Sequence, residues 1–251
     1  MTDILLSGCC GRMGRAIASY VSERDEFNIV AGLDLKQGDR PFPVFISPFN
    51  FDGKADVIID FSSPAALPGL LEYAVEKKIP AVIATTGLDD AHIELIHKAS
   101  KEIPIFFSAN MSLGVNLVCE LAKVAAKVLG DSYDIEVVEA HHNQKVDAPS
   151  GTALMIADAI SSELETRPNY EYNRQAKREK RPKNEIGIHS IRGGTIVGEH
   201  EVIFAGYNEV IKISHSAASK ELFAAGAVNA SKFIKDKEPG LYSMSDIVMA
   251  Q

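Results

Sequence analysis

Residues 3–14 of this chain read DILLSGCCGRMG, an apolar run followed by three glycines spaced as GxxGxxG. The apolar run at 3–7 predicts a buried strand, and apolar residues at helical spacing predict a helix over 11–24. Glycines between a strand and a helix let the backbone turn tightly and approach a pyrophosphate, whose charge favours the helix N-terminus. The spacing differs by one residue from the usual GxGxxG pattern, and an ordinary strand–helix turn is the alternative interpretation.

Asp34 favours dinucleotide binding over that alternative. It ends the second predicted strand, 20 residues after Gly14, which is about the separation at which an acid accepts hydrogen bonds from ribose hydroxyls. Such an acid favours NADH over NADPH. Leu35 follows where a basic residue would bind a 2′-phosphate, whereas Lys36 and Arg12 are close enough in sequence to supply positive charge. The sequence therefore predicts NADH or NADPH as the cofactor.

Strands and helices alternate along the first third of the chain. Further strands are predicted at 27–34, 56–61, 79–85 and 103–108, with helices at 65–77 and 91–102. Continuous Val- and Ile-rich strands separated by helices indicate a parallel sheet covered on both faces. The predicted fold class is α/β, with an N-terminal Rossmann-type, doubly wound parallel sheet.

The pattern changes after about residue 110. The second part has helices at 115–129 and around 151–164, with Leu154, Ala157, Ile160 and Leu164 on one apolar face, and strands at 133–139, 186–191, 200–205 and 209–215. Residues 166–184 are basic and polar, and they predict an exposed connection. We expect a second α+β domain over 113–219, and a helix at 220–234 that returns to the first domain, which then comprises 1–112 plus 220–251.

Composition excludes several classes of function. The 26 basic against 34 acidic residues give a net charge of −8, which argues against nucleic acid as the main partner. No apolar run approaches the roughly 20 residues of a membrane span, and the N-terminus lacks the features of a signal peptide. We therefore expect a cytoplasmic protein. The three cysteines form no disulfide framework and no CxxC pair, so they predict buried small residues in a reducing compartment.

A second candidate site lies at 134–152, DIEVVEAHHNQKVDAPSGT. Histidine titrates near neutrality and can donate a proton as hydride arrives, while the Lys145 ammonium can hold a carboxylate. Backbone amides at Gly151 and Thr152 open a helix and suit a second carboxylate. Adjacent residues of a strand point to opposite sides, so of His141 and His142 at most one is the proton donor, and either could be structural.

No suitably spaced Cys, Asp or Glu accompanies the histidine pair, so we predict no metal site. The other histidines are interpreted as structural: His92, His97, His189, His200 and His215. Two turns after predicted strands, residues 84–87 (ATTG) and 108–111 (SANM), lie where parallel sheets bind ligands. Helix capping by Thr86 or Asp89 and a polar hinge at Asn110 are the alternatives.

These residues resemble the dihydrodipicolinate reductase family, whose members act in bacterial lysine and diaminopimelate biosynthesis. The resemblance covers essentially the whole chain and rests on these stretches: GCCGRMG at 8–14, DFSSP at 60–64, ATTG at 84–87, SANMSLGVN at 108–116, EAHHNQKVDAPSGTA at 139–153 and IRGGTIVGEHEVIFAG at 191–206. It implies reduction of a cyclic dicarboxylate by NAD(P)H to tetrahydrodipicolinate, and a second domain that binds substrate and forms a homotetramer.

The resemblance also implies roles for single residues. His141 corresponds to the proton donor, Lys145 to a second general acid that binds a carboxylate, His142 to a substrate contact, and Gly151 and Thr152 to carboxylate-binding residues. The implied cofactor contacts are Gly8, Cys9, Cys10, Gly11, Arg12, Met13, Asp34, Ala84, Thr85, Thr86, Ser108, Ala109, Asn110 and Met111. Other interpretations are a reductase of another Rossmann family, a redox sensor, and a relative without activity; the first would lack the histidine–lysine run and the last is disfavoured by His141 and Lys145.

Overall fold

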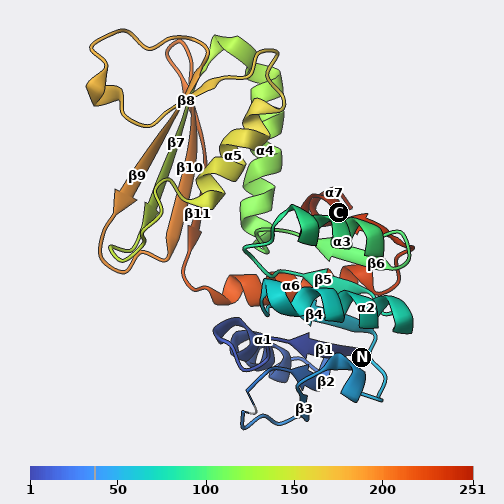
Figure 1. Ribbon diagram of the computed structural model, residues 1–251. Coiled ribbons are helices and arrows are strands. Elements are labelled where there is room, and N and C mark those ends of the chain that lie inside the picture. Colours follow the sequence, from blue (N-terminus) through green and yellow to red (C-terminus); the bar gives the residue numbers. More distant parts are fainter. Residues whose placement is uncertain (37, 251) are drawn as a thin grey trace. The chain divides into compact units, whose positions relative to one another are not determined.

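The computed structural model describes residues 1–36 and 38–250, with the backbone alone at residue 131. The chain forms two compact units: residues 1–112 with 221–251, and residues 113–220. Figure 1 shows the first as a sheet between helices and the second as a sheet with two helices. None of the helices in the described ranges is long and apolar enough to cross a membrane.

The first unit contains a seven-stranded sheet in the order β12-β6-β5-β4-β1-β2-β3, in which all pairs are parallel. Its strands are β1 (Thr2–Ser7), β2 (Phe27–Leu33), β3 (Val44–Phe45), β4 (Val57–Asp60), β5 (Ala81–Ile83), β6 (Pro104–Phe107) and β12 (Gly240–Tyr242). The strand order reverses between β1 and β4, as in doubly wound sheets, so the predicted fold class is confirmed.

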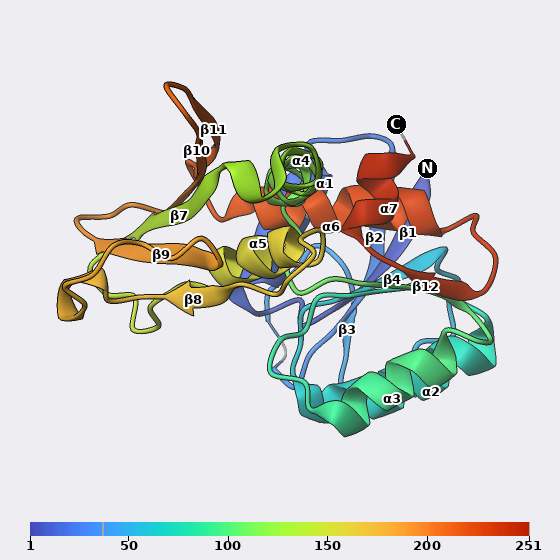
Figure 2. The same cartoon turned by 90° about the horizontal axis from the view of Figure 1, so that it is seen from above.

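Helices cover both faces of this sheet. They are α1 (Arg12–Ser22), α2 (Leu67–Lys77), α3 (Asp90–Ala99), α6 (Glu221–Ile234) and α7 (Met244–Met249). Figure 2 shows α2 and α3 on one face and α1 and α6 on the other. Every residue of β4 and β5 is buried, because a central parallel strand has a helix layer on each side. Three elements have no counterpart in the sequence predictions: β3, β12 and α7, which are short segments at sheet edges and near the chain end.

The second unit is built on a mixed five-stranded sheet in the order β11-β10-β7-β9-β8. Its strands are β7 (Asp134–His141), β8 (Asn169–Glu171), β9 (Glu185–Arg192), β10 (Gly198–Ala205) and β11 (Val210–Ala217). The pairs of β9 with β7 and with β8 are parallel, and the two pairs formed by β10 are antiparallel. Helices α4 (Leu113–Leu129) and α5 (Gly151–Ser161) share one apolar core with this sheet.

One expectation about this unit needs correction and another is incomplete. The buried face of α5 carries Ala153, Ile156, Ala157 and Ile160, and the helix ends before Leu164. Ala157 and Ile160 were predicted on this face, whereas Leu154 and Leu164 are partly buried and pack at the edge of the same core.

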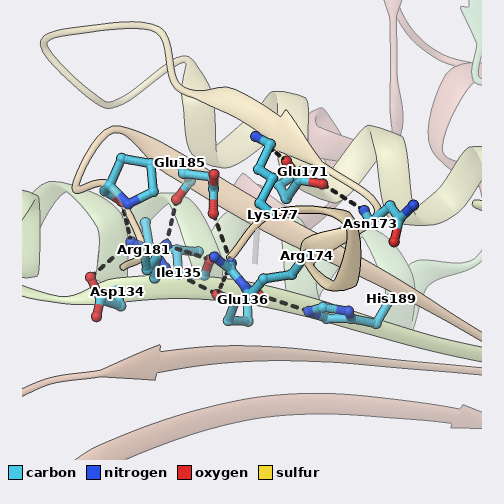
Figure 3. A network of polar contacts seen from close by, with 11 residues as sticks. Asp134, Ile135, Glu136, Glu171, Asn173, Arg174, Lys177, Arg181, Glu185 and His189 are labelled. Carbon is cyan, nitrogen blue, oxygen red and sulfur yellow. Dashed lines mark hydrogen bonds and ion pairs between the residues drawn. The ribbon is translucent and has the colours of Figure 1, made fainter. Parts of the chain in front are cut away.

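Residues 166–184 are more than an exposed connection. They contain β8 and a short 3-10 helix, Arg174–Ala176. Arg181 donates from Nε to Glu136 at 3.0 Å and from Nη1 to Asp134 at 2.8 Å, and Arg174 reaches Glu136 at 3.1 Å (Figure 3). The basic residues that predicted a solvated loop therefore hold it against the acidic side chains of β7, because burying a charge requires a partner.

Candidate active site

The glycine turn after β1 has the geometry that a bound phosphate requires. Gly8 has a φ of +77°, and a Cβ there would lie 2.5 Å from the carbonyl oxygen of Phe61. A Cβ at Gly14 would lie 2.3 Å from the carbonyl oxygen of Gly8. Gly11 is the N-cap of α1, and no side chain among the described residues caps that helix. The first amides of α1 are thus left for a ligand, which fits a pyrophosphate.

Asp34 is held beside this turn by two backbone amides. Its Oδ2 accepts from the amide of Cys10 at 2.9 Å, and its Oδ1 accepts from the amide of Lys36 at 3.0 Å. Leu35 is 84% exposed, so its side chain leaves the rim of the turn open. The acid that the sequence analysis assigned to a ribose therefore lies against the glycine loop, where an adenosine ribose would be placed next to the pyrophosphate.

The paired cysteines play a different part. Cys9 is fully buried, and its Sγ lies 3.8 Å from that of Cys10. These sulfur atoms and a carboxylate oxygen of Asp34 form the one cluster of possible metal ligands within residues 1–36 and 38–250. Burial raises the pKa of the Cys9 thiol to about 12. Its Sγ fills the space beside Gly32, where a Cβ would lie 2.5 Å from it, so Cys9 packs β2 against the glycine turn.

A pocket of about 320 Å³ opens at the carboxyl ends of the strands in the first unit. Its lining residues are Met13, Phe61, Ser62, Ala84, Thr85, Thr86, Ser108, Ala109, Met111 and Phe223. Seven of these were predicted from the glycine turn and the two later turns. Asn110 lies outside the lining, and its Oδ1 accepts from the amide of Ser112 at 2.9 Å. Three lining residues were not predicted from the sequence: Phe61, Ser62 and Phe223. The first two follow directly after β4 and could have been found by that position.

In the second unit, His141 is the last residue of β7 and is 9% exposed. Its Nδ1 lies 2.6 Å from Oε2 of Glu139, a fully buried carboxylate on the same face of the strand. A neutral imidazole in this contact carries its proton on Nδ1, so Nε2 is left for exchange with a ligand. A Cβ at Gly198 would lie 3.1 Å from Nε2, so the glycine keeps that nitrogen clear.

Glu139 is the centre of a larger network. Arg192 on β9 grips both of its oxygens, with Nη1–Oε2 at 2.8 Å and Nη2–Oε1 at 2.7 Å, and the amide of Ser150 donates to Oε1 at 3.1 Å. Burial by itself raises the pKa of Glu139, but hydrogen bonds from Arg192, Ser190 and His141 outweigh it and lower the pKa to about 2. The carboxylate is therefore charged at neutral pH and orients both His141 and the start of α5.

His200 on β10 completes this cluster. Its ring centroid lies 5.2 Å from that of His141, and its Nε2 lies 3.0 Å from the hydroxyl of Ser150. Burial, with the charge of His141 as a smaller cause, lowers the pKa of His200 to about 4, so it is neutral at pH 7. Arg192 and His200 were missed as site residues because β9 and β10 are distant in sequence and only strand pairing brings them to His141. Glu139 was missed too, although it lies two residues before His141 on the same strand and could have been found by that spacing.

The remaining predicted residues lie on the loop between β7 and α5. The ammonium of Lys145 contacts both oxygens of Asp147 at 2.8 Å, and the carbonyl of Asp147 accepts from Nη2 of Arg192 at 2.7 Å. His142 is half-buried. Gly151 and Thr152 are the first residues of α5, whose N-cap Ser150 accepts from the amide of Ala153 at 3.2 Å. A Cβ at Gly151 would meet nothing within 4 Å, so there is open space beside this residue.

A doubly wound sheet with a phosphate-binding glycine turn, and a second unit that carries an oriented histidine and a lysine, define a two-domain NAD(P)H-dependent oxidoreductase. Comparison with known proteins identifies the group within that class. Family models for the two halves of dihydrodipicolinate reductase match residues 2–111 (N-terminus) and 114–248 (C-terminus). The chain belongs to this family, also called 4-hydroxy-tetrahydrodipicolinate reductases, and the resemblance stated from the sequence is confirmed.

Individual relatives cover the chain from end to end. The 4-hydroxy-tetrahydrodipicolinate reductase of Caldanaerobacter subterraneus subsp. tengcongensis is 54% identical over 99% of this chain and 98% of its own length. That of Clostridium tetani is 49% identical over 97% and 96%. The solved structure of a dipicolinate-bound dihydrodipicolinate reductase from Paenisporosarcina sp. TG-14 superimposes with a TM-score of 0.82 over 98% of this chain and 99% of that one, at 23% identity. The last comparison supports the fold alone.

Proposed function

We propose that this chain reduces 4-hydroxy-tetrahydrodipicolinate to tetrahydrodipicolinate, with His141 as the proton donor. The observation that carries the assignment is the 2.6 Å contact between Nδ1 of His141 and the buried carboxylate of Glu139. A carboxylate in this position fixes the tautomer of the ring and stabilises the imidazolium, as it does wherever a histidine acts as general acid or base.

The first domain, residues 1–112 plus 220–251, binds NADH or NADPH in this proposal. The bound cofactor supplies hydride. Gly8 to Met13 hold the pyrophosphate, and Asp34 accepts from the adenosine ribose. The turns that follow β5 and β6 would contact the bound cofactor through Ala84, Thr85, Thr86, Ser108, Ala109, Asn110 and Met111. Two glycines at which a Cβ would strike backbone, and the α1 N-terminus without a side-chain cap, support this assignment.

The second domain, residues 113–219, binds the dicarboxylate. Lys145 pairs with one carboxylate and acts as a second general acid, and His142 contacts the substrate. The amides of Gly151 and Thr152 bind the other carboxylate at the N-terminus of α5, where the helix dipole favours negative charge. Substrate binding at Lys145 requires displacement of Asp147, which is 59% exposed and can turn into solvent.

The test compares His141→Gln and Lys145→Ala with a matched control, His189→Gln. His189 also pairs with a carboxylate, that of Glu136 at 2.9 Å (Figure 3), but it lies in the network that holds residues 166–184. We expect kcat/KM for the dicarboxylate to fall at least about 100-fold in the first two variants, since general acid catalysis contributes about that much, and to stay within about twofold in the control. Near-wild-type rates in the double variant of His141 and Lys145 would refute the assignment.

Cofactor preference follows from the rim of the glycine turn. Asp34 favours NADH because a carboxylate repels a 2′-phosphate, while Lys36 and Arg12 permit NADPH. Steady-state kcat/KM with each cofactor on the same substrate measures the balance. We expect both to be used, and Leu35→Arg to raise the NADPH value relative to the NADH value.

We also propose that the protein works as a homotetramer in the cytoplasm. Helix α4 exposes Leu117, Leu121, Val124 and Val128, four apolar side chains at helical spacing, and β11 exposes Val210 and Ile211. Apolar groups in such number on the second unit favour association of copies. The free cysteines suit a reducing compartment. Light scattering after size exclusion measures the assembly, and a monomeric mass at micromolar concentration would refute it.

A further inference from the structure

Asp60 is a fully buried carboxyl group that the reaction as described does not use. It is the last residue of β4, which lies between β1 and β5 in the sheet. In the strand register it stands beside Ser7 of β1 and beside Ile83 of β5. The side chain is therefore at the point where three strands end, under the turns that follow them.

Its hydrogen bonds run to the turns after β4 and β5. Oδ1 accepts from the hydroxyl of Ser62 at 2.6 Å and from its amide at 3.2 Å. Oδ2 accepts from the hydroxyl of Thr85 at 2.6 Å. Ser62 and Thr85 line the pocket of the first unit, so one carboxyl group joins two walls of that pocket.

We propose that Asp60 is a positioning residue for the nicotinamide half of the cofactor, a proposal that rests on the function assigned above. It holds the hydroxyl hydrogens of Ser62 and Thr85, so that each oxygen can meet a ligand only as an acceptor. The chemical group that such a pair recognises is an amide N–H, as in the carboxamide of a nicotinamide ring. Asp60 itself does not touch the ligand and acts through these two side chains.

The network also explains why an acid is kept at a site that disfavours charge. Burial raises the pKa of Asp60, and the hydrogen bonds from Ser62 and Thr85 oppose that effect only in part. Replacing the carboxyl group by an amide takes one of its two acceptor oxygens away from these hydroxyls, and the hydroxyl that loses its acceptor becomes free to rotate. We expect the pocket to keep its shape after this substitution, while the hydroxyl groups of Ser62 and Thr85 no longer point in the direction that the ligand requires.

The experiment is Asp60→Asn in the full-length protein. The amide has the same size but offers a single acceptor oxygen, and its NH₂ group confronts a hydroxyl that donated before. We expect the Kd of NADH, measured by fluorescence titration without substrate, to rise about tenfold, consistent with the loss of one hydrogen bond to a charged group. At saturating cofactor, the KM of the dicarboxylate stays within about twofold.

Two control variants separate positioning from general destabilisation. Asp56→Asn makes the same change just before β4, where the carboxylate accepts from the amide of Asp3 at 2.8 Å. Ser231→Ala removes a buried hydroxyl from α6 that bonds to the carbonyl of Val228. We expect both to bind NADH as the wild type does. Ser62→Ala, which deletes the shorter contact to Oδ1, provides a second test if Asp60→Asn folds poorly, with an expected rise in Kd of several-fold.

An NADH Kd within twofold of wild type in Asp60→Asn, or in Ser62→Ala where the former does not fold, overturns the proposal. The proposal is also overturned if Ser231→Ala has a lower melting temperature and its NADH Kd rises as much as that of Asp60→Asn. The rise in Kd is then explained by lost stability alone. The outcome is distinguishable from failure of the assigned function: a wild-type protein that binds neither NADH nor NADPH refutes that function, whereas intact binding by wild type and variants alike refutes only the role of Asp60.

Discussion

The substitution Glu139→Gln removes the charge at the centre of the second unit while keeping the size of the side chain. In the wild type the carboxylate meets Nδ1 of His141 at 2.6 Å and both guanidinium nitrogens of Arg192 at 2.7 and 2.8 Å, and it is fully buried. The glutamine amide can face His141 with either its oxygen or its NH₂ group. The tautomer of the ring is then no longer fixed, and the imidazolium loses its counter-charge.

The size of the effect follows from these contacts. A hydrogen bond to a charged group contributes about 1.5–3 kcal/mol when it is removed. With about 2 kcal/mol of this loss falling on the protonated form of His141, kcat decreases about 30-fold. Arg192 is left partly buried beside a neutral partner, so the second unit is destabilised by a further amount of about 3 kcal/mol.

The assay is NADH oxidation at saturating dicarboxylate and cofactor, together with thermal unfolding. The matched control is Glu136→Gln, the same change on the same strand, in an ion network that also contains two arginines and a histidine (Figure 3). Both variants lose stability. We expect kcat to fall only in Glu139→Gln, and the Kd of NADH to stay at the wild-type value in both.

Equal kcat values for the two variants would show that Glu139 acts only through stability, and the orientation of His141 by its carboxylate would then be wrong. Wild-type kcat in Glu139→Gln, with the loss of stability present, would refute His141 as the proton donor in its present tautomer.

Three further predictions concern stability, substrate binding and the glycine turn. The pKa of Glu139 lies at about 2 against an ordinary 4.5. Its contribution of about 3 kcal/mol to the free energy of unfolding is therefore present above pH 4.5 and is lost as the pH falls towards 2. Urea unfolding should show that the difference in stability between wild type and Glu139→Gln closes over that range, and a constant difference contradicts the prediction. Asp147→Asn frees the ammonium of Lys145 from an exposed pair worth at most about 1 kcal/mol, and we expect the KM of the dicarboxylate to fall by up to about fivefold, whereas a rise would assign Asp147 to substrate binding. Gly8→Ala forces a Cβ to 2.5 Å from a carbonyl oxygen at a φ of +77° and should raise the Kd of NADH at least about tenfold, while Gly69→Ala on α2, where a Cβ meets nothing within 4 Å, should leave it unchanged.

Most elements of the first unit were predictable because each carries its own pattern. Buried parallel strands such as β4 are continuous apolar runs, and α1 alternates apolar and polar residues at helical spacing. The short strands β3 and β12 were not predictable, since two or three residues carry no periodicity and pair only because an edge of the sheet is available. The same holds for β8, whose basic neighbours resemble a solvated loop until Glu136 and Glu185 are placed opposite them.

The amino-acid sequence determined the class of cofactor, and it predicted which residues would meet an acidic substrate. The phosphate-binding turn and the run from His141 to Thr152 are local motifs. Their residues lie a few positions apart in the chain, so the spacing can be recognised in the sequence alone. What only the tertiary structure decided is how these residues are held. Strand pairing brings Glu139 to its partner Arg192 across 53 positions of the chain, and Asp60 accepts from hydroxyls of two separate turns. Buried charges need partners, and in a folded chain those partners come from whichever strands lie alongside, which no local pattern specifies.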